Sequence, residues 1–406
     1  MASSPSPTNP NSFHTDFCLQ LAYKVLQKQI QNGSNFVSSP LSLHIILSLV
    51  AAGAKGKTLE ELLSFLGSPS KDDLNSASSR IVSSLRNVEG TENGDPNLSF
   101  VNGAWVDIRF GLKASFEELV KNVYRSSIEE VDFRNKAEEV AEKVNSWTEK
   151  ETNGLIRELL PLGSIKKNTV LVLANALYFK GAWNSKKFDP TMTETKSFHL
   201  LSGGNVQVPY MTSMPYDEEY YYGSFKNYKI LAIPYHQSGR TPLKFTMYFF
   251  LPHEKDGLRD LIHNLNSNPR CLNEEMELWS DEVQVRIPRF KFSFNLDAME
   301  DLKELGLTLP FDVPGELTEL SDCSNGDMIF VSKIVQKAFV EVNEEGTEAA
   351  AGTDAVLDCY EADSPSPSPP KRKFFVADHP FLFIIREETS MVVFFIGAVL
   401  NPLLDS

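Results

Sequence analysis

The closest approach to a known catalytic motif is a near match to a phosphate-binding loop, at Ala51-Ala52-Gly53-Ala54-Lys55-Gly56-Lys57-Thr58. In such loops a first glycine follows a β-strand, and a helix comes next, so that backbone N–H groups surround the phosphates. Here Ala51 replaces the first glycine, and the preceding residues have the spacing of an amphipathic helix. Thr58 instead fits the N-cap of the next helix, because Glu61 stands three residues later as in a capping box. We therefore expect no nucleotide binding.

No other set of reactive side chains has the spacing of a catalytic or metal site. The sequence lacks a G-x-S-x-G nucleophile elbow, and His253-Glu254 lacks the second histidine of a zinc-protease motif. His379, the one histidine in a dense cluster, is best explained as a structural residue. The four cysteines contain no C-x-x-C pair and lie far apart, at Cys18, Cys271, Cys323 and Cys359. The sequence therefore predicts no enzymatic activity, no cofactor and no metal site.

The elements that must position these residues change in character along the chain. Helical spacing dominates the first part, and Ser39-Pro40 is typical of an N-cap followed by proline at the first helical position. Apolar runs typical of buried strands come later, at 170–179, 245–251, 283–287, 329–342 and 392–399. Helices followed by strands, without a βαβ rhythm, predict an α+β fold. We expect residues 1–12 to form a disordered tail and 13–406 a single domain.

The overall charge excludes several classes of partner. With 39 Lys and Arg against 54 Asp and Glu, the net charge of the 406-residue chain is −15, so binding to nucleic acid or an anionic membrane is not expected. The longest apolar stretch, 391–404, is too short and too interrupted to span a bilayer. The first residues lack the apolar region of a signal peptide, and few cysteines favour a reducing compartment. We expect a cytoplasmic protein.

Residues 344–373, EEGTEAAAGTDAVLDCYEADSPSPSPPKRK, form a segment of distinct composition between two predicted strands. Uninterrupted loops longer than about 15 residues within a domain are usually functional or disordered. The segment is therefore either an exposed bait loop attached at both ends or a disordered insertion. Its last residues, Pro369-Pro370-Lys371-Arg372-Lys373, resemble a short nuclear-import signal, a pattern that is also common by chance.

Five long motifs occur in one order along the chain. They are NFVSSPLS at 35–42, NALYFKGAW at 175–183, EVNEEGTEAAA at 341–351, FVADHPF at 375–381 and FIGAVLNP at 395–402. Together they resemble the serpin family, specifically the plant, serpin-Z-like subgroup. The resemblance implies a fold with three β-sheets, about nine helices and an exposed reactive-centre loop, here about 344–373.

The resemblance also implies a protease inhibitor that acts as a suicide substrate. In inhibitory members the target protease cleaves the loop and stays covalently attached as an acyl-enzyme, while the loop inserts as a new strand into the central sheet. A covalent complex with a target protease is thus the expected partnership of an otherwise monomeric protein. The region that binds glycosaminoglycans in some relatives, about 70–86, carries only three basic residues and two acidic ones. We therefore expect no activation by heparin.

The loop sequence itself is suited to insertion, because alternate residues of a strand face opposite sides of a sheet. One set is uncharged and forms the expected inserting face: Thr347, Ala349, Ala351, Thr353, Ala355 and Leu357. The other set holds every charge: Glu348, Ala350, Gly352, Asp354, Val356 and Asp358. The hinge implied by the family comprises Glu344, Glu345, Gly346, Thr347, Glu348, Ala349, Ala350 and Ala351, with Gly346 as its pivot.

Family spacing places the reactive bond between Tyr360 and Glu361, fourteen positions beyond Gly346. An aromatic residue there suits the hydrophobic specificity pocket of a chymotrypsin-like protease. The rival bait is the Asp358–Cys359 bond, because residues 355–358 resemble what caspase-like proteases prefer. The alternative function is a non-inhibitory serpin with a carrier, chaperone or regulatory binding role.

Overall fold

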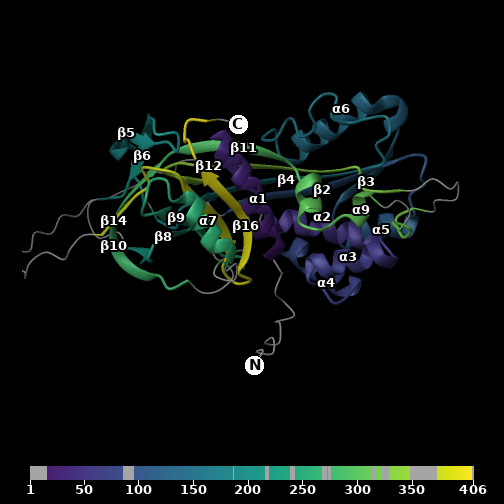
Figure 1. Ribbon diagram of the computed structural model, residues 1–406, viewed down its shortest axis with the longest axis horizontal. Helices are drawn as coiled ribbons and strands as arrows, with labels where there is room; N and C mark the ends of the chain where they lie inside the picture. The colour runs from purple at the N-terminus through teal and green to yellow at the C-terminus, as the bar shows by residue number, and fades with distance from the viewer. Residues whose placement is uncertain are drawn as a thin grey trace, which may run out of the picture.

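Two β-sheets and a set of helices make up the chain in the computed structural model (Figure 1), which describes residues 16–85, 96–185, 187–214, 219–237, 243–267, 272, 276–312, 316–321, 329–347 and 373–404. The predicted tail, 1–12, lies outside the described residues. The helices within this part of the chain are α1 (Asp16–Asn32), α2 (Pro40–Gly53), α3 (Gly56–Leu66), α4 (Lys71–Leu85), α5 (Ala114–Asn122), α6 (Phe133–Glu151), α7 (Leu258–Ser267), α8 (Met299–Glu304) and α9 (Leu309–Asp312).

The central sheet has the strand order β11–β12–β4–β2–β3, with the short strand β13 added beside β4. Its strands are β2 (Asn97–Asp107), β3 (Ser127–Val131), β4 (Leu171–Ala182), β11 (Phe290–Asp297), β12 (Lys333–Val342) and β13 (Gly346–Thr347). The apolar run predicted at 170–179 is β4, whose residues are almost all buried. β4 and β12 run parallel over seven residue pairs, from Lys333–Val172 to Phe339–Tyr178.

The second sheet follows the order β1–β16–β15–β9–β8–β7–β10–β6–β5, with β14 paired to β10. Its strands are β1 (Phe36–Ser38), β5 (Glu194–His199), β6 (Asn205–Thr212), β7 (Glu219–Ser224), β8 (Tyr228–Pro234), β9 (Phe245–Pro252), β10 (Trp279–Pro288), β14 (Lys373–Val376), β15 (Phe381–Glu387) and β16 (Val392–Val399). The first half of β10 pairs with β7 and its second half with β6 and β14, so β10 joins two of the three expected sheets. The predicted α+β class is confirmed.

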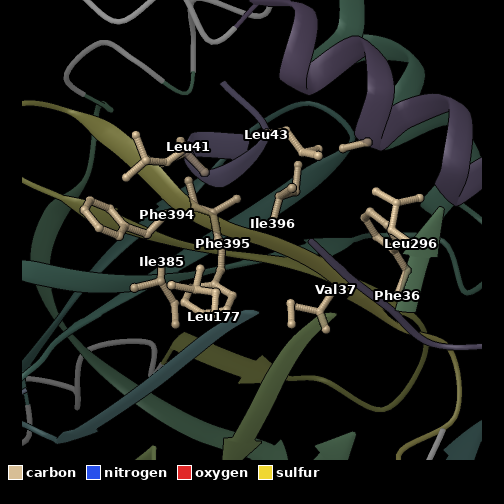
Figure 2. Packing of buried hydrophobic residues seen from close by; sticks show 14 of the residues in the cluster. Phe36, Val37, Leu41, Leu43, Leu177, Leu296, Ile385, Phe394, Phe395 and Ile396 are labelled. Carbon is tan, nitrogen blue, oxygen red and sulfur yellow. The ribbon is translucent and has the colours of Figure 1, made fainter. Parts of the chain in front are cut away.

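The core lies between the two sheets around α2, every residue of which is buried. Ser39 caps this helix as predicted, because its side chain accepts a hydrogen bond from the Ser42 N–H, and Pro40 occupies the first helical position. Figure 2 shows side chains from β1, α2, β4 and β16 meeting in this layer, among them Phe36, Leu41, Leu177, Phe395 and Ile396. A helix without an exposed face has to be enclosed in this way. The amphipathic pattern expected for this segment is therefore wrong, because its polar residues Ser42, His44 and Ser48 are buried as well.

Helix α6 covers the opposite face of the central sheet. Val140, Val144 and Phe133 from α6 pack on Trp105 of β2 and Val172 of β4 in a second, smaller core. The segment after α6 is attached to the sheet through the Lys337 Nζ to Glu158 carbonyl and Asn295 Nδ2 to Leu159 carbonyl hydrogen bonds, of 2.7 and 2.9 Å. Figure 1 shows α6 and helices α2–α4 on opposite sides of β2 and β4. No helix in the described ranges is long and apolar enough to cross a membrane.

The predicted N-cap role of Thr58 is wrong. Helix α3 begins two residues earlier, at Gly56, and its N-cap position is Lys55, which makes no side-chain cap. Glu316 caps the helix instead, because its Oε2 accepts the Thr58 N–H at 2.6 Å. The N–H groups of this helix start are therefore directed toward a carboxylate from a distant part of the chain.

A buried polar row crosses the middle of the central sheet. Asn102, Asn175 and Gln336 are aligned in register on β2, β4 and β12. The Gln336 side chain accepts hydrogen bonds from Ser38 Oγ (2.6 Å) and the Ser39 N–H (2.8 Å), and it donates to the Ser39 carbonyl (2.9 Å). These bonds attach β12 to the start of α2. Asn175 Nδ2 donates to Asn102 and Val101, whereas its buried Oδ1 has no hydrogen-bond partner among the described residues.

We expect Gln336→Leu to lower the free energy of unfolding by about 2–4 kcal/mol, because buried groups of Ser38 and Ser39 lose their partners. Urea unfolding followed by circular dichroism measures this change. The matched control is Gln207→Leu on the exposed face of β6, which should change stability by less than about 0.5 kcal/mol. Equal effects of the two variants would contradict the role given to Gln336.

Candidate functional site

The chain reverses direction immediately after β12. Asn343 and Gly346 form an antiparallel bridge through two backbone hydrogen bonds, of 2.9 and 3.2 Å. The Asn343 side chain stabilises the turn, because its Oδ1 accepts the Glu345 N–H at 3.0 Å. The residues that follow therefore start back along the strand they have just left.

Strand β13 occupies the position that this reversal opens at the end of the sheet. The β4–β12 pairing stops at Tyr178–Phe339, and beyond it Gly346 pairs with Ala182 and Thr347 with Gly181, antiparallel to β4. The Trp183 N–H donates to the Glu345 carbonyl at 3.1 Å. β13 is thus a short strand beside β4, and its direction leads toward the boundary where β4 and β12 pair.

Gly346 is required by the geometry of this turn. Its φ is +135°, and a Cβ at this position would lie 2.1 Å from the Gly181 carbonyl oxygen. Only glycine fits both conditions, because it has no Cβ and adopts positive φ at little cost.

Glu344 anchors the turn to the neighbouring strands. Its residue is 5% exposed, and its Oε1 accepts hydrogen bonds from Arg289 Nε (2.7 Å) and Nη2 (2.6 Å), and from Thr193 Oγ1. Arg289 lies between β10 and β11, and Thr193 precedes β5. One carboxylate therefore connects the end of β12 to both sheets, in a charge-assisted contact of the stronger kind.

Trp183 closes the site on the core side. Its ring stacks on Tyr235, with 4.9 Å between ring centroids and 17° between planes, and its Nε1 donates to the Asn343 carbonyl at 3.1 Å. Tyr235 also meets Phe179 edge to face at 4.8 Å. The turn therefore rests on an aromatic cluster that belongs to β4 and to the end of β8.

The structure brings together four of the expected hinge residues, namely Glu344, Glu345, Gly346 and Thr347. The other hinge residues, 348–351, the remaining inserting residues, 349–357, and both candidate reactive bonds, Tyr360–Glu361 and Asp358–Cys359, lie outside the described residues. Sequence reasoning missed Arg289, Thr193 and Trp183 as hinge contacts. Trp183 was within a quoted motif, whereas no local signal connects Arg289 or Thr193 with Glu344.

Comparison with known proteins agrees with this architecture. A family profile described as serpin (serine protease inhibitor) matches residues 12–402. The chain belongs to the serpin family. This serpin is 45% identical over 393 residues to Serpin-Z10 from Arabidopsis thaliana, covering 96% of this chain and 97% of the relative. It is 46% identical over 374 residues to Serpin-ZXA from Oryza sativa, covering 92% and 91%.

Solved structures place the fold in the same family. The structure of Arabidopsis AtSerpin1 in its native stressed conformation superposes with a TM-score of 0.85 at 40% identity, covering 98% of this chain and all of that one. The predicted serpin fold and similarity to plant serpins are confirmed, and the family is one of protease inhibitors.

We expect Arg289→Gln to destabilise the hinge by about 1–3 kcal/mol, because the buried Glu344 carboxylate loses its charged partner. Glu344→Gln should cost less, since the Arg289 side chain is 41% exposed and can turn to solvent. The double variant should resemble Glu344→Gln alone. Thermal unfolding midpoints, together with hydrogen exchange of residues 343–347, measure all three. Additive effects would show that the two residues act independently.

Proposed function

We propose that this serpin is a suicide-substrate inhibitor whose cleaved loop inserts between β4 and β12 and traps the protease as an acyl-enzyme. The observation that carries the proposal is β13: the loop already begins as a strand antiparallel to β4, at the end of the β4–β12 line. Its first residue is a glycine in a conformation and space that exclude other residues. Once β4 and β12 separate, a loop that starts in this way would insert by extending the same pairing along β4.

Continuing the β13–β4 register supports the expected inserting face. On this register Thr347, Ala349, Ala351, Thr353, Ala355 and Leu357 stand opposite Gly181, Phe179, Leu177, Asn175, Leu173 and Leu171 of β4. Leu171, Leu173, Leu177 and Phe179 belong to the main core, whereas Val172 and Ala174 belong to the core beneath α6. The uncharged set would therefore enter the main core, and the charged set would face the side that α6 covers.

Thr353 would meet the buried polar row. The register places it opposite Asn175 on β4, and continuation of the Asn343–Gly346 bridge places it opposite Gln336 on β12. Its hydroxyl is the one polar group of the inserting face at this level, and Asn175 Oδ1 lacks a partner among the described residues. Insertion would supply a donor to that oxygen, which adds to the driving force.

Insertion cannot occur before the existing pairing opens. The seven β4–β12 pairs and the two hydrogen bonds that attach the segment after α6 must separate. A strand of about a dozen residues then gains pairing on both sides, at about 0.5–1.5 kcal/mol per hydrogen bond, which rivals the stability of an ordinary domain. The uncleaved protein is thus held by a kinetic barrier.

The reactive bond that we propose is Tyr360–Glu361, and Asp358–Cys359 is its rival. Cleavage after Tyr360 suits a chymotrypsin-like protease, whereas cleavage after Asp358 suits a caspase-like one and leaves an inserted strand two residues shorter.

The test is to mix the protein with chymotrypsin and, separately, with an Asp-specific protease, and to run denaturing gels with mass spectrometry of the released C-terminal peptide. The expected result is a band at the summed mass of chymotrypsin and residues 1–360, together with a released peptide that begins at Glu361. Complete cleavage by both proteases without such a band would contradict inhibition and favour the non-inhibitory alternative.

Matched variants separate insertion from simple cleavage. Thr353→Lys would place a charge in the main core and should abolish the covalent band while cleavage continues, because burying an unpaired charge is strongly unfavourable. Glu348→Lys introduces the same residue on the charged face, where the register places it opposite the partly exposed Lys180 of β4, and should retain the band. Loss of the band in both variants, or in neither, would contradict the register.

A further inference from the structure

A polar pocket of about 290 Å³ lies between β14 and the hairpin of β8 and β9. Lys229 at the start of β8, Pro252 at the end of β9 and Lys255 just beyond line one side. The other side is lined by Phe374 of β14 and by Asp378 and His379, which follow this strand. The pocket is separate from the hinge, and the proposed inhibition does not use it.

Two lysine ammonium groups at this pocket have spare hydrogen-bond donors. Lys229 Nζ donates to the Phe374 carbonyl at 3.2 Å, and Lys255 Nζ donates to His199 Nε2 at 2.7 Å. Neither lysine forms an ion pair with a carboxylate in the described part of the chain, although an ammonium group has three donors to offer. Neither ammonium group is therefore in direct contact with a carboxylate there, although the charge of Lys255 acts on the nearby Asp378.

The single carboxylate among the residues that line the pocket, Asp378, is in contact with His379. His379 is buried, and its ring nitrogens lie 2.7 Å from Asp378 Oδ1 and 3.0 Å from the Pro252 carbonyl oxygen. Burial raises the pKa of Asp378, but the hydrogen bond from His379 and the nearby charge of Lys255 outweigh it and lower the pKa overall. With two lysines and one carboxylate among its lining residues, the pocket carries a net positive charge.

We propose that this pocket binds a small polyanion, whose phosphate or carboxylate oxygens bridge the ammonium groups of Lys229 and Lys255. Cationic donors with free positions are the usual recognition elements for such oxyanions. The site stands out on a chain whose net charge is −15. Its volume is near the lower end of the about 300–1,000 Å³ typical of ligand pockets, which fits a small metabolite-sized anion.

The bound anion would fasten β14 to the β8–β9 hairpin. β14 begins directly after residues 348–372, so it anchors the far end of the bait loop. β14 pairs with β10 along one side. From β8, Lys229 donates a hydrogen bond to the Phe374 carbonyl of β14. A ligand that binds only the folded state stabilises it in proportion to the logarithm of its concentration. Occupancy would thereby reduce local opening of β14.

Isothermal titration of the full-length protein with inorganic pyrophosphate and, separately, with succinate tests the proposal and distinguishes the two anion classes. Potassium chloride at matched ionic strength is the salt control. Lys229→Gln and Lys255→Gln should each weaken binding about tenfold or more, as expected for loss of a hydrogen bond to a charged group. Lys226→Gln removes the same charge from an exposed position on the β7–β8 turn, outside the pocket, and should leave the affinity within about twofold.

Hydrogen exchange provides a second measurement that does not depend on protease inhibition. The bound anion should slow exchange of the peptide that covers residues 373–379, and this protection should disappear in Lys255→Gln, whose exposed side chain makes misfolding no concern. Absence of binding by both anions at millimolar concentration would overturn the proposal. Equal weakening by Lys226→Gln and Lys229→Gln would also overturn it, because it would indicate non-specific screening.

Discussion

The parallel pairing of β4 with β12 is the constraint on which the rest of the molecule depends. It closes the central sheet over seven residue pairs and leaves the end of the sheet, beyond Tyr178 and Phe339, to β13. Three contacts stabilise the turn after β12 at that end. Glu344 has a charged partner, Gly346 fits against Gly181, and Trp183 donates a hydrogen bond to the turn. β4 and β12 are thus paired directly along most of the sheet, whereas at one end an added strand, β13, pairs with β4.

In the middle of the same sheet, the hydrogen bonding of buried polar groups is less complete than at its end. Gln336 uses its side chain fully on Ser38 and Ser39, but the buried Asn175 next to it keeps an acceptor without a partner in the described chain. Natural proteins usually pair such groups, and exceptions mark sites under functional constraint. An unsatisfied oxygen on β4 beside β12 is consistent with the proposal that these strands separate and that the native state is not the most stable arrangement of its residues.

Local patterns predicted the elements better than the contacts between them. The Ser39 cap and the buried strand at β4 each depend on residues close together in sequence, and each was found as expected. The cap of α3 was wrong because Glu316, 258 positions from Thr58, supplies it. The partnership of Arg289 with Glu344 was missed for the same reason, since the tertiary fold alone brings them together. Continuity of two sheets through β10 likewise depends on pairing that the strand's own residues do not indicate.

The position of Trp183 gives the protein an intrinsic optical probe. Its indole stacks on Tyr235 and donates to the Asn343 carbonyl, so its surroundings change whenever the turn after β12 rearranges. The other three tryptophans lie elsewhere. Trp147 of α6 contacts Trp105 of β2, and Trp279 is largely exposed. The emission of the unlabelled chain therefore contains one component from the hinge, which single Trp→Phe replacement would isolate. The kinetics of a buried structural change would then be accessible in a stopped-flow fluorimeter, without attached dyes.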